Sequence, residues 1–184
     1  IFDFVPGHTS IDHPWFQASK LPTPNKYSNW YVWTNNTWDG GGQEFLGKMV
    51  QGYSERNGVF MTNYFWHQPA LNFGFGKVDP SKPWQLAANH PDVLALKKEM
   101  TNVLKYWLDM GADGFRIDMA GSLTKNDEGS AECIKWWKEI RQMLDTKYPQ
   151  AFIVSEWSHP PAMGYRLMGI AFLIKKEKEI FQHS

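Results

Sequence analysis

The order of elements in this 184-residue chain predicts an α/β fold, with a parallel sheet and helices packed outside it. Two amphipathic stretches alternate with three short apolar stretches: 91–110 and 130–147 as helices, about 1–6, 113–118 and 151–156 as strands. Such alternation is typical of parallel strands joined through helices. Between the first strand and the first helix, residues 7–90 are rich in Pro, Gly, Asn and Asp, which predicts a long irregular excursion. A connection of that length is uncommon unless it is functional.

The first predicted helix has both a start signal and an apolar face. Asn89 or His90 can cap it, Pro91 suits the first helical position, and Gly111 suits the residue after the last turn. The apolar residues recur every three or four positions: Val93, Leu96, Met100, Val103 and Trp107. This spacing predicts one buried face.

The second predicted helix is amphipathic in the same way. Its apolar face consists of Cys133, Trp137, Ile140 and Leu144, and Tyr148-Pro149 ends it. The three tryptophans of the two helices, Trp107, Trp136 and Trp137, are expected in the core.

Composition excludes several classes of protein. The net charge is zero, which argues against a nucleic-acid partner. No stretch of 18 apolar residues is present, so no membrane span is expected. A single cysteine, Cys133, rules out an internal disulfide. Aromatic residues make up 16% of the chain, including ten Trp, which favours a surface that stacks on a flat, partly apolar ligand.

Two strand ends carry charged residues on the same face. In "GFRID", Arg116 and Asp118 are two residues apart and therefore share a face, opposite Phe115 and Ile117. In "AFIVSE", Glu156 comes last. One β-α-β step separates the two carboxylates, so they are expected on adjacent strand ends over one pocket, where parallel barrels carry their active sites.

A carboxylate pair of this kind suits retaining glycoside hydrolysis, in which one group attacks the sugar and the other acts as acid and base. Arg116 beside Asp118 favours an ionised nucleophile, which leaves Glu156 as the protonated acid. The alternative is an Arg–Asp pair that only packs a strand end, with Glu156 merely solvated.

Four segments together resemble the α-amylase family of glycoside hydrolases, family 13. "GFRIDMA" resembles the region that holds the nucleophile and its arginine, and "IVSEW" the region of the acid/base. "DFVPGHTS" and "QPALN" are similar to two further regions of the family. The resemblance implies catalytic roles for Asp118 and Glu156, and substrate binding by Arg116.

The resemblance also assigns residues outside the carboxylate pair. Asp3 is implied as a supporting aspartate, His8 as a sugar contact, and Asn72 as a residue near the substrate cleft. Trp157, after Glu156, is a candidate for stacking on a sugar. Trp66 is a second candidate, with core packing as its alternative.

The implied fold is a partial (β/α)8 TIM barrel that holds about strands three to five. Residues 1–165 would be a partial catalytic domain, with about 9–70 as an insertion like the family's domain B. Residues 166–184 form an atypical tail, for which a frameshift or truncation is the expectation. The family's later His-Asp region is not found, and the chain alone is expected to be poorly soluble and slow on starch.

No metal or cofactor is assigned from the sequence. Gly7 stands where the family usually has an Asn that ligates calcium in many members, so a structural calcium is doubtful. The implied activity is retaining hydrolysis of α-1,4-glucosidic bonds in starch or maltooligosaccharides. The alternative is a non-enzymatic or inactive truncated relative, kept for binding or assembly. The family's starch-cleaving members are often secreted, but no compartment is assigned.

Overall fold

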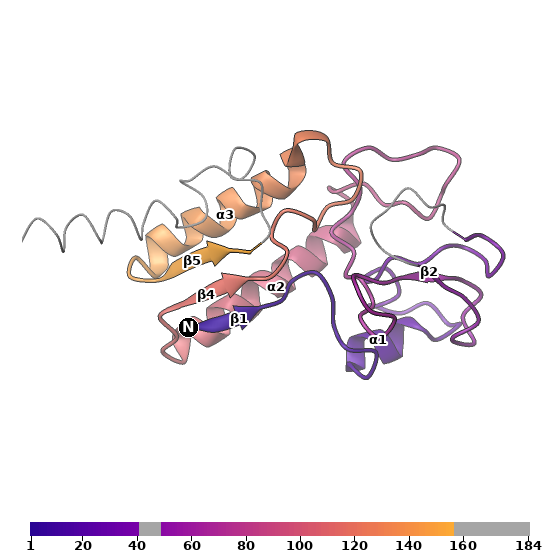
Figure 1. The fold of residues 1–184 in the computed structure, drawn as a ribbon, viewed down its shortest axis with the longest axis horizontal. Helices are drawn as coiled ribbons and strands as arrows, with labels where there is room; N and C mark the ends of the chain where they lie inside the picture. Colours follow the sequence, from indigo (N-terminus) through magenta and orange to yellow (C-terminus); the bar gives the residue numbers. More distant parts are fainter. Residues whose placement is uncertain (41–48, 157–184) are drawn as a thin grey trace, which may run out of the picture.

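The computed structural model describes residues 1–40 and 49–156 (Figure 1). The main sheet has three strands, β1 (Phe2–Phe4), β4 (Gly114–Ile117) and β5 (Phe152–Ser155). Two long helices connect to it, α2 (Pro91–Asp109) and α3 (Ala131–Lys147), the latter preceded by a 3-10 turn at Glu128–Ser130. Between β1 and α2 lie one short helix, α1 (Pro14–Ser19), and the strands β2 (Met49–Val50) and β3 (Phe60–Met61). The predicted order of strands and helices is confirmed.

The three strands of the main sheet are parallel, in the spatial order β1–β4–β5, which confirms the predicted parallel sheet. The central strand aligns Arg116 with Asp3 on one side and with Val154 on the other. Within the described residues the sheet does not close into a barrel.

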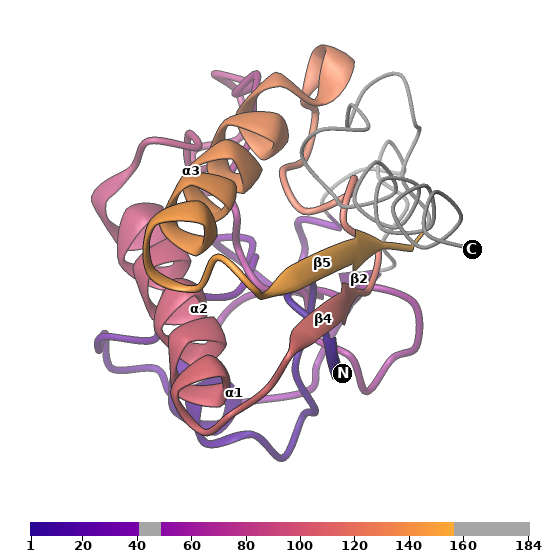
Figure 2. The ribbon, with the colours of Figure 1, turned by 90° about the vertical axis from the view of Figure 1, so that its left-hand side faces the viewer.

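Helices α2 and α3 lie together against one face of the sheet (Figure 2). The side chains that point toward them are fully buried, notably Phe115, Ile117 and Ile153. Because side chains alternate along a strand, the residues between these point to the opposite face. Arg116 therefore lies on the face away from the helices, as predicted.

Helix α2 begins as predicted but buries a slightly different face. His90 is the N-cap, and its ring Nδ1 accepts a hydrogen bond from the Asp92 amide at 3.2 Å. In the second half of the helix, Leu104 and Leu108 are buried. The predicted core position of Trp107 is wrong, because its side chain is 40% exposed and lies beside the Phe2 ring.

Helix α3 buries the predicted face, together with Trp136. Two of its side chains also hold the loop that follows β4: Trp137 Nε1 donates to the Ala120 carbonyl at 2.9 Å, and Cys133 Sγ donates to the same oxygen at 3.1 Å. The core packing predicted for Cys133 is confirmed, and the residue has this further contact.

The segment between β1 and α2 has its own apolar cluster, which consists of Val32, Met61, Ala70, Phe75 and Trp84. Most of its backbone pairing comes from isolated bridges between loops, as expected for an irregular excursion. One half-buried cation stabilises it: Arg56 Nη1 donates to the carbonyls of Ser19 and Ser28, at 2.7 Å each. In the described part of the chain, none of the helices is both long and apolar enough to cross a membrane.

Candidate active site

The strand register brings Asp118 and Glu156 to the same edge of the sheet. The Asp118 amide donates to the Phe4 carbonyl, and the Glu156 amide donates to the Ile117 carbonyl, both at 2.9 Å. These bonds continue the parallel ladder past the last strand residues. Since Arg116 is aligned with Val154, two positions further on Asp118 is level with Glu156.

Arg116 lies among three carboxylates, one from each strand or strand end. Its Nη1 donates to both oxygens of Asp3, at 2.7 and 2.9 Å, and to Asp118 Oδ1 at 3.2 Å. Its Nη2 forms an ion pair with Glu156 Oε1. The predicted common face of Arg116 and Asp118 is confirmed. The contact with Glu156 was not predicted, because it depends on the pairing of β4 with β5.

These charges keep the arginine protonated. The pKa of Arg116 is raised above its ordinary value, chiefly by the hydrogen bond to Asp3; burial opposes this rise, and the negative charges of the three carboxylates add to it. The side chains of Arg116, Asp118 and Glu156 are 34%, 20% and 31% exposed. All three side chains are therefore partly accessible to solvent.

His8 follows β1 at the end of the sheet where Asp118 and Glu156 lie. Its backbone bridges to Ala70, and its ring Nδ1 lies 3.0 Å from Asn63 Nδ2. Burial lowers the pKa of His8 below 6.5, and the charge of the nearby His67 lowers it further. The ring is therefore neutral at physiological pH.

Asn72, predicted to lie near the substrate cleft, is bound to the backbone of two loops. Its side chain is buried, its Nδ2 donates to the Asn29 carbonyl at 3.2 Å, and its Oδ1 accepts from the Gly74 amide at 3.1 Å. Both ends of the amide thus bind backbone. In this structure Asn72 braces two loops, and a sugar contact would require it to release one of them.

The loop 64–67 presents a group of exposed aromatic rings. Tyr64, Phe65 and Trp66 are 73%, 53% and 58% exposed, so the alternative of core packing for Trp66 is wrong. His67 stacks on Phe65 with ring centres 5.5 Å apart. Trp157, the other stacking candidate, and the tail after it lie outside the described residues.

Two features beside the catalytic candidates were missed by the sequence analysis. Met119, directly after Asp118, has a left-handed backbone (φ 49°), which is uncommon for a residue with a side chain. Its carbonyl accepts from the amide of Ser122 at 3.0 Å. The second feature is Asn63, whose side-chain amide contacts the His8 ring. Neither this contact nor the Met119–Ser122 hydrogen bond follows from a local sequence pattern.

The described residues near Gly7 do not fit a calcium site of the family's usual kind. Gly7 offers no side-chain ligand, and a Cβ there would lie 3.2 Å from Asn63 Nδ2, an amide nitrogen that is no cation ligand. Across the described ranges, no group of three or more His, Cys, Asp or Glu side chains is placed to hold a metal ion.

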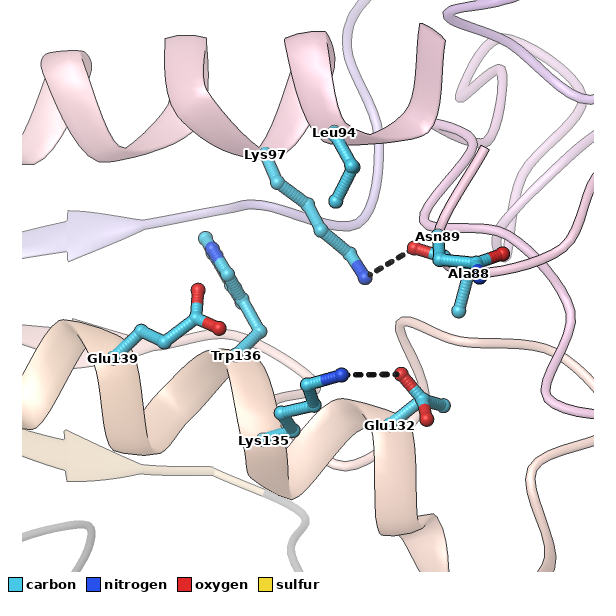
Figure 3. Close-up of a pocket in the computed structure, with 8 residues that line it drawn as sticks. All are labelled: Ala88, Asn89, Leu94, Lys97, Glu132, Lys135, Trp136 and Glu139. Atoms are coloured by element: carbon cyan, nitrogen blue, oxygen red, sulfur yellow. Dashed lines mark hydrogen bonds and ion pairs between the residues drawn. The ribbon is translucent and has the colours of Figure 1, made fainter. Parts of the chain in front are cut away.

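A cavity of about 170 Å³ lies between the first turns of α2 and α3 (Figure 3). Lys97 points into it and donates to the Ala88 carbonyl at 3.0 Å, while Lys135 pairs with Glu132 at 3.9 Å. Its lining includes none of the predicted site residues. The candidate active site is therefore defined by the strand ends rather than by this cavity.

Comparison with known proteins shows to which family this chain belongs. The family model described as "Alpha amylase, catalytic domain" matches residues 1–166. The chain belongs to the α-amylase family, glycoside hydrolase family 13. This confirms the resemblance seen in the sequence.

Three relatives with different named activities are similar to this chain. It is 31% identical over 170 residues to a trehalose synthase of Pimelobacter sp., covering 88% of this chain and 26% of that protein. It is 27% identical to alpha-amylase 3 of Dictyoglomus thermophilum, covering 85% and 26%. It is 32% identical to an oligo-1,6-glucosidase of Heyndrickxia coagulans, covering 68% and 20%. The chain thus spans about a quarter or less of each relative.

Solved structures agree on the fold. The alpha-glucosyl transfer enzyme XgtA matches with a TM-score of 0.62 at 24% identity, covering 85% of this chain and 32% of that one. At this identity the likeness supports the arrangement of strands and helices alone. The family model thus shows the family, and this likeness shows the fold.

Proposed function

We propose that this chain carries the catalytic carboxylate pair of an enzyme that hydrolyses α-1,4-glucosidic bonds in starch or maltooligosaccharides with retention of configuration, a role in carbohydrate metabolism. The observation that carries the proposal is the placement of Asp118 and Glu156 on neighbouring strand ends, both bound by Arg116. Neighbouring strands lie about 4.8 Å apart. This spacing suits the roughly 5–5.5 Å between carboxyl groups of retaining enzymes.

The first step forms a bond from a carboxylate oxygen of Asp118 to the anomeric carbon. The bond from that carbon to the leaving oxygen breaks, and the leaving oxygen takes a proton from Glu156. Glu156 must be protonated for this step, and protonation releases its ion pair with Arg116. The positive charge of Arg116 then serves Asp118, which has to attack in its ionised form.

The second step reverses the first with water. Glu156, now a carboxylate, takes a proton from a water molecule, whose oxygen bonds to the anomeric carbon while the bond to Asp118 breaks. Asp3 holds the Arg116 side chain in place through both of its carboxylate oxygens. The Arg116 guanidinium thereby stays beside Asp118 and Glu156 during both steps of the reaction.

Other residues of the proposal bind the substrate. His8 contacts a sugar hydroxyl, and the exposed rings of Tyr64, Phe65 and Trp66 offer flat apolar surfaces for sugar rings. The proposal includes no calcium beside Gly7, because an amide nitrogen occupies the adjacent space. In the proposed whole enzyme, the present sheet is part of a (β/α)8 barrel and about residues 9–70 form domain B.

A second candidate is glucosyl transfer, favoured by the similarity to a trehalose synthase over 88% of this chain. Both reactions share the first step. They differ in the acceptor, which is water in hydrolysis and a sugar hydroxyl in transfer. Incubating the complete protein that contains this chain with maltose separates them, since hydrolysis gives glucose and transfer to a second anomeric hydroxyl gives a trehalose-type product.

The mechanism is tested by trapping the covalent intermediate. In Glu156→Gln, α-glucosyl fluoride still reacts, because fluoride leaves without an acid, but water is no longer activated. We expect a glucosyl group to accumulate on the peptide that contains Asp118, detected by mass spectrometry of the complete protein. The matched control is Glu128→Gln, at an exposed position in the 3-10 turn, which should turn over normally.

Asp118→Asn should lower kcat at least ~10³-fold, because Asp3, the other carboxylate on Arg116, lies on β1, which is separated from β5 by β4. Unchanged activity of Asp118→Asn would refute the assignment. A complete protein with no activity on any α-glucoside, but with intact folding, would instead support the non-enzymatic alternative.

A further inference from the structure

We propose that Asn63 is a positioning residue that sets the ring tautomer of His8, and that the missing side chain at Gly7 gives it the room to do so. The role of His8 in sugar binding rests on the proposed function. The contact between the two side chains does not, since it is a property of the folded chain. Nothing in the family resemblance or in the local sequence pattern pointed to Asn63.

The backbone brings these residues together from distant parts of the sequence. The Leu71 amide donates to the Gly7 carbonyl at 3.0 Å, which pairs the end of the β1 loop with residues 69–71. The Asn63 amide donates to the Gln68 carbonyl at 2.8 Å, which pairs the other side of the same segment. His8 and Asn63 thus flank one central segment, and their side chains meet across it.

The chemistry of the contact selects one form of the ring. The amide nitrogen of Asn63 lies 3.0 Å from His8 Nδ1, and an amide nitrogen can only donate. His8 Nδ1 must therefore accept, and the proton of the neutral ring lies on Nε2. An imidazolium carries protons on both nitrogens and would face the amide donor with a second donor. The burial that lowers the pKa of His8 acts in the same direction.

The consequence for the site is a defined hydrogen-bond donor. With Nδ1 occupied by Asn63, Nε2–H remains for a ligand hydroxyl, and the neutral ring adds no charge beside the carboxylates. A free histidine would divide between two tautomers, only one of which donates from Nε2.

Gly7 is the permissive partner of this pair. A Cβ on Gly7 would lie 3.2 Å from Asn63 Nδ2 and 3.7 Å from its Cγ, which is closer than most such contacts. Any larger side chain at position 7 would press on the Asn63 amide and turn it away from His8. The two positions are therefore expected to act together, Gly7 by its small size and Asn63 by its donor.

The test is the imidazole ¹⁵N spectrum of the labelled complete protein that contains this chain. In the natural chain we expect His8 to be the Nε2–H tautomer and to titrate below its ordinary range. In Asn63→Asp, a carboxylate oxygen accepts from Nδ1–H, so the tautomer switches and the titration midpoint rises by about 1 pH unit or more. Asn63→Ala and Gly7→Leu should both give a mixture of tautomers. Asn102→Ala, which removes an exposed amide that contacts Glu99 on α2, is the matched control and should leave His8 unchanged.

Two results would overturn the inference: a proton on His8 Nδ1 in the natural chain, or an unchanged His8 spectrum in both Asn63 variants. If only the proposed function is wrong, the NMR result is different. In that case the tautomer still depends on Asn63, whereas adding maltotriose to the complete protein leaves the His8 Nε2 resonance in place.

Discussion

Replacing Gly114 with Ala tests whether the pairing of β4 with β5 holds the catalytic carboxylates together. Gly114 is opposite Phe152 in the parallel ladder. A Cβ at this position would overlap the Phe152 carbonyl oxygen and lie 3.0 Å from its carbonyl carbon. Both of these atoms belong to the backbone, so no side-chain rotation relieves the clash. The strands would have to separate.

The cost follows from the size of that movement. Ordinary carbon contacts begin near 3.5 Å, so relief of both contacts needs an opening of about 1 Å. The hydrogen bond from the Phe152 amide to the Asp113 carbonyl, now 3.2 Å, would then exceed bonding distance. One lost backbone hydrogen bond costs about 1 kcal/mol. Strain from the added methyl group costs about 1–3 kcal/mol, so the expected loss in free energy of unfolding is about 2–4 kcal/mol.

Urea unfolding followed by tryptophan fluorescence measures this loss. With an m-value of roughly 2 kcal/mol/M, the midpoint should fall by about 1–2 M. Gly40→Ala is the matched control, because a Cβ at Gly40 meets nothing within 4 Å, and its midpoint should stay near that of the natural chain. A Gly114→Ala midpoint equal to that of the control would refute the argument that close strand approach at Gly114 maintains this register.

Two half-buried cations give further predictions. Burial lowers the pKa of Lys125 to about 8, so between about pH 8 and 10.5 the unfolded chain binds a proton that the folded chain has released, and the free energy of unfolding should rise with pH. Lys125→Met should make this rise smaller, as measured by urea unfolding across that range, and an equal rise in both proteins would contradict it. Arg56→Met leaves the Ser19 and Ser28 carbonyls without their donor and should destabilise the chain by about 2–4 kcal/mol. Thermal unfolding checks this, with Lys135→Met as the comparison, because the Lys135 side chain is 65% exposed and its pair with Glu132 is 3.9 Å long.

The sequence predicted those parts of the structure that depend on local periodicity. The bounds of α2 and α3 follow from repeating apolar positions and from residues that start or stop helices. The shared face of Arg116 and Asp118 follows from strand alternation in the same way. Even here the second half of α2 was misjudged. Val103 and Leu104 are adjacent apolar residues, and only packing against the sheet decides which of them is buried.

The contacts that shape the candidate site depend on residues far apart in the chain. His8 and Asn63 are separated by 55 positions, and Asp3 and Arg116 by 113. No local sequence pattern predicts these contacts, because they depend on which loops and strands the fold brings together. The buried position of Asn72 has the same origin, since its partner Asn29 lies 43 residues away. Residues that bear chemistry can thus be named from sequence, whereas their neighbours need the fold.

The arrangement of Arg116 with its carboxylates depends on strand order as much as on residue type. Arg116 is on the central strand, so one guanidinium can reach Asp3 on one neighbour and Glu156 beyond the other. Side chains alternate, so a slip of one residue between β4 and β5 would turn Glu156 toward the helices. A slip between β1 and β4 would turn Asp3 away in the same manner. The same two ladders that hold the sheet together therefore decide whether the charged residues form a site at all.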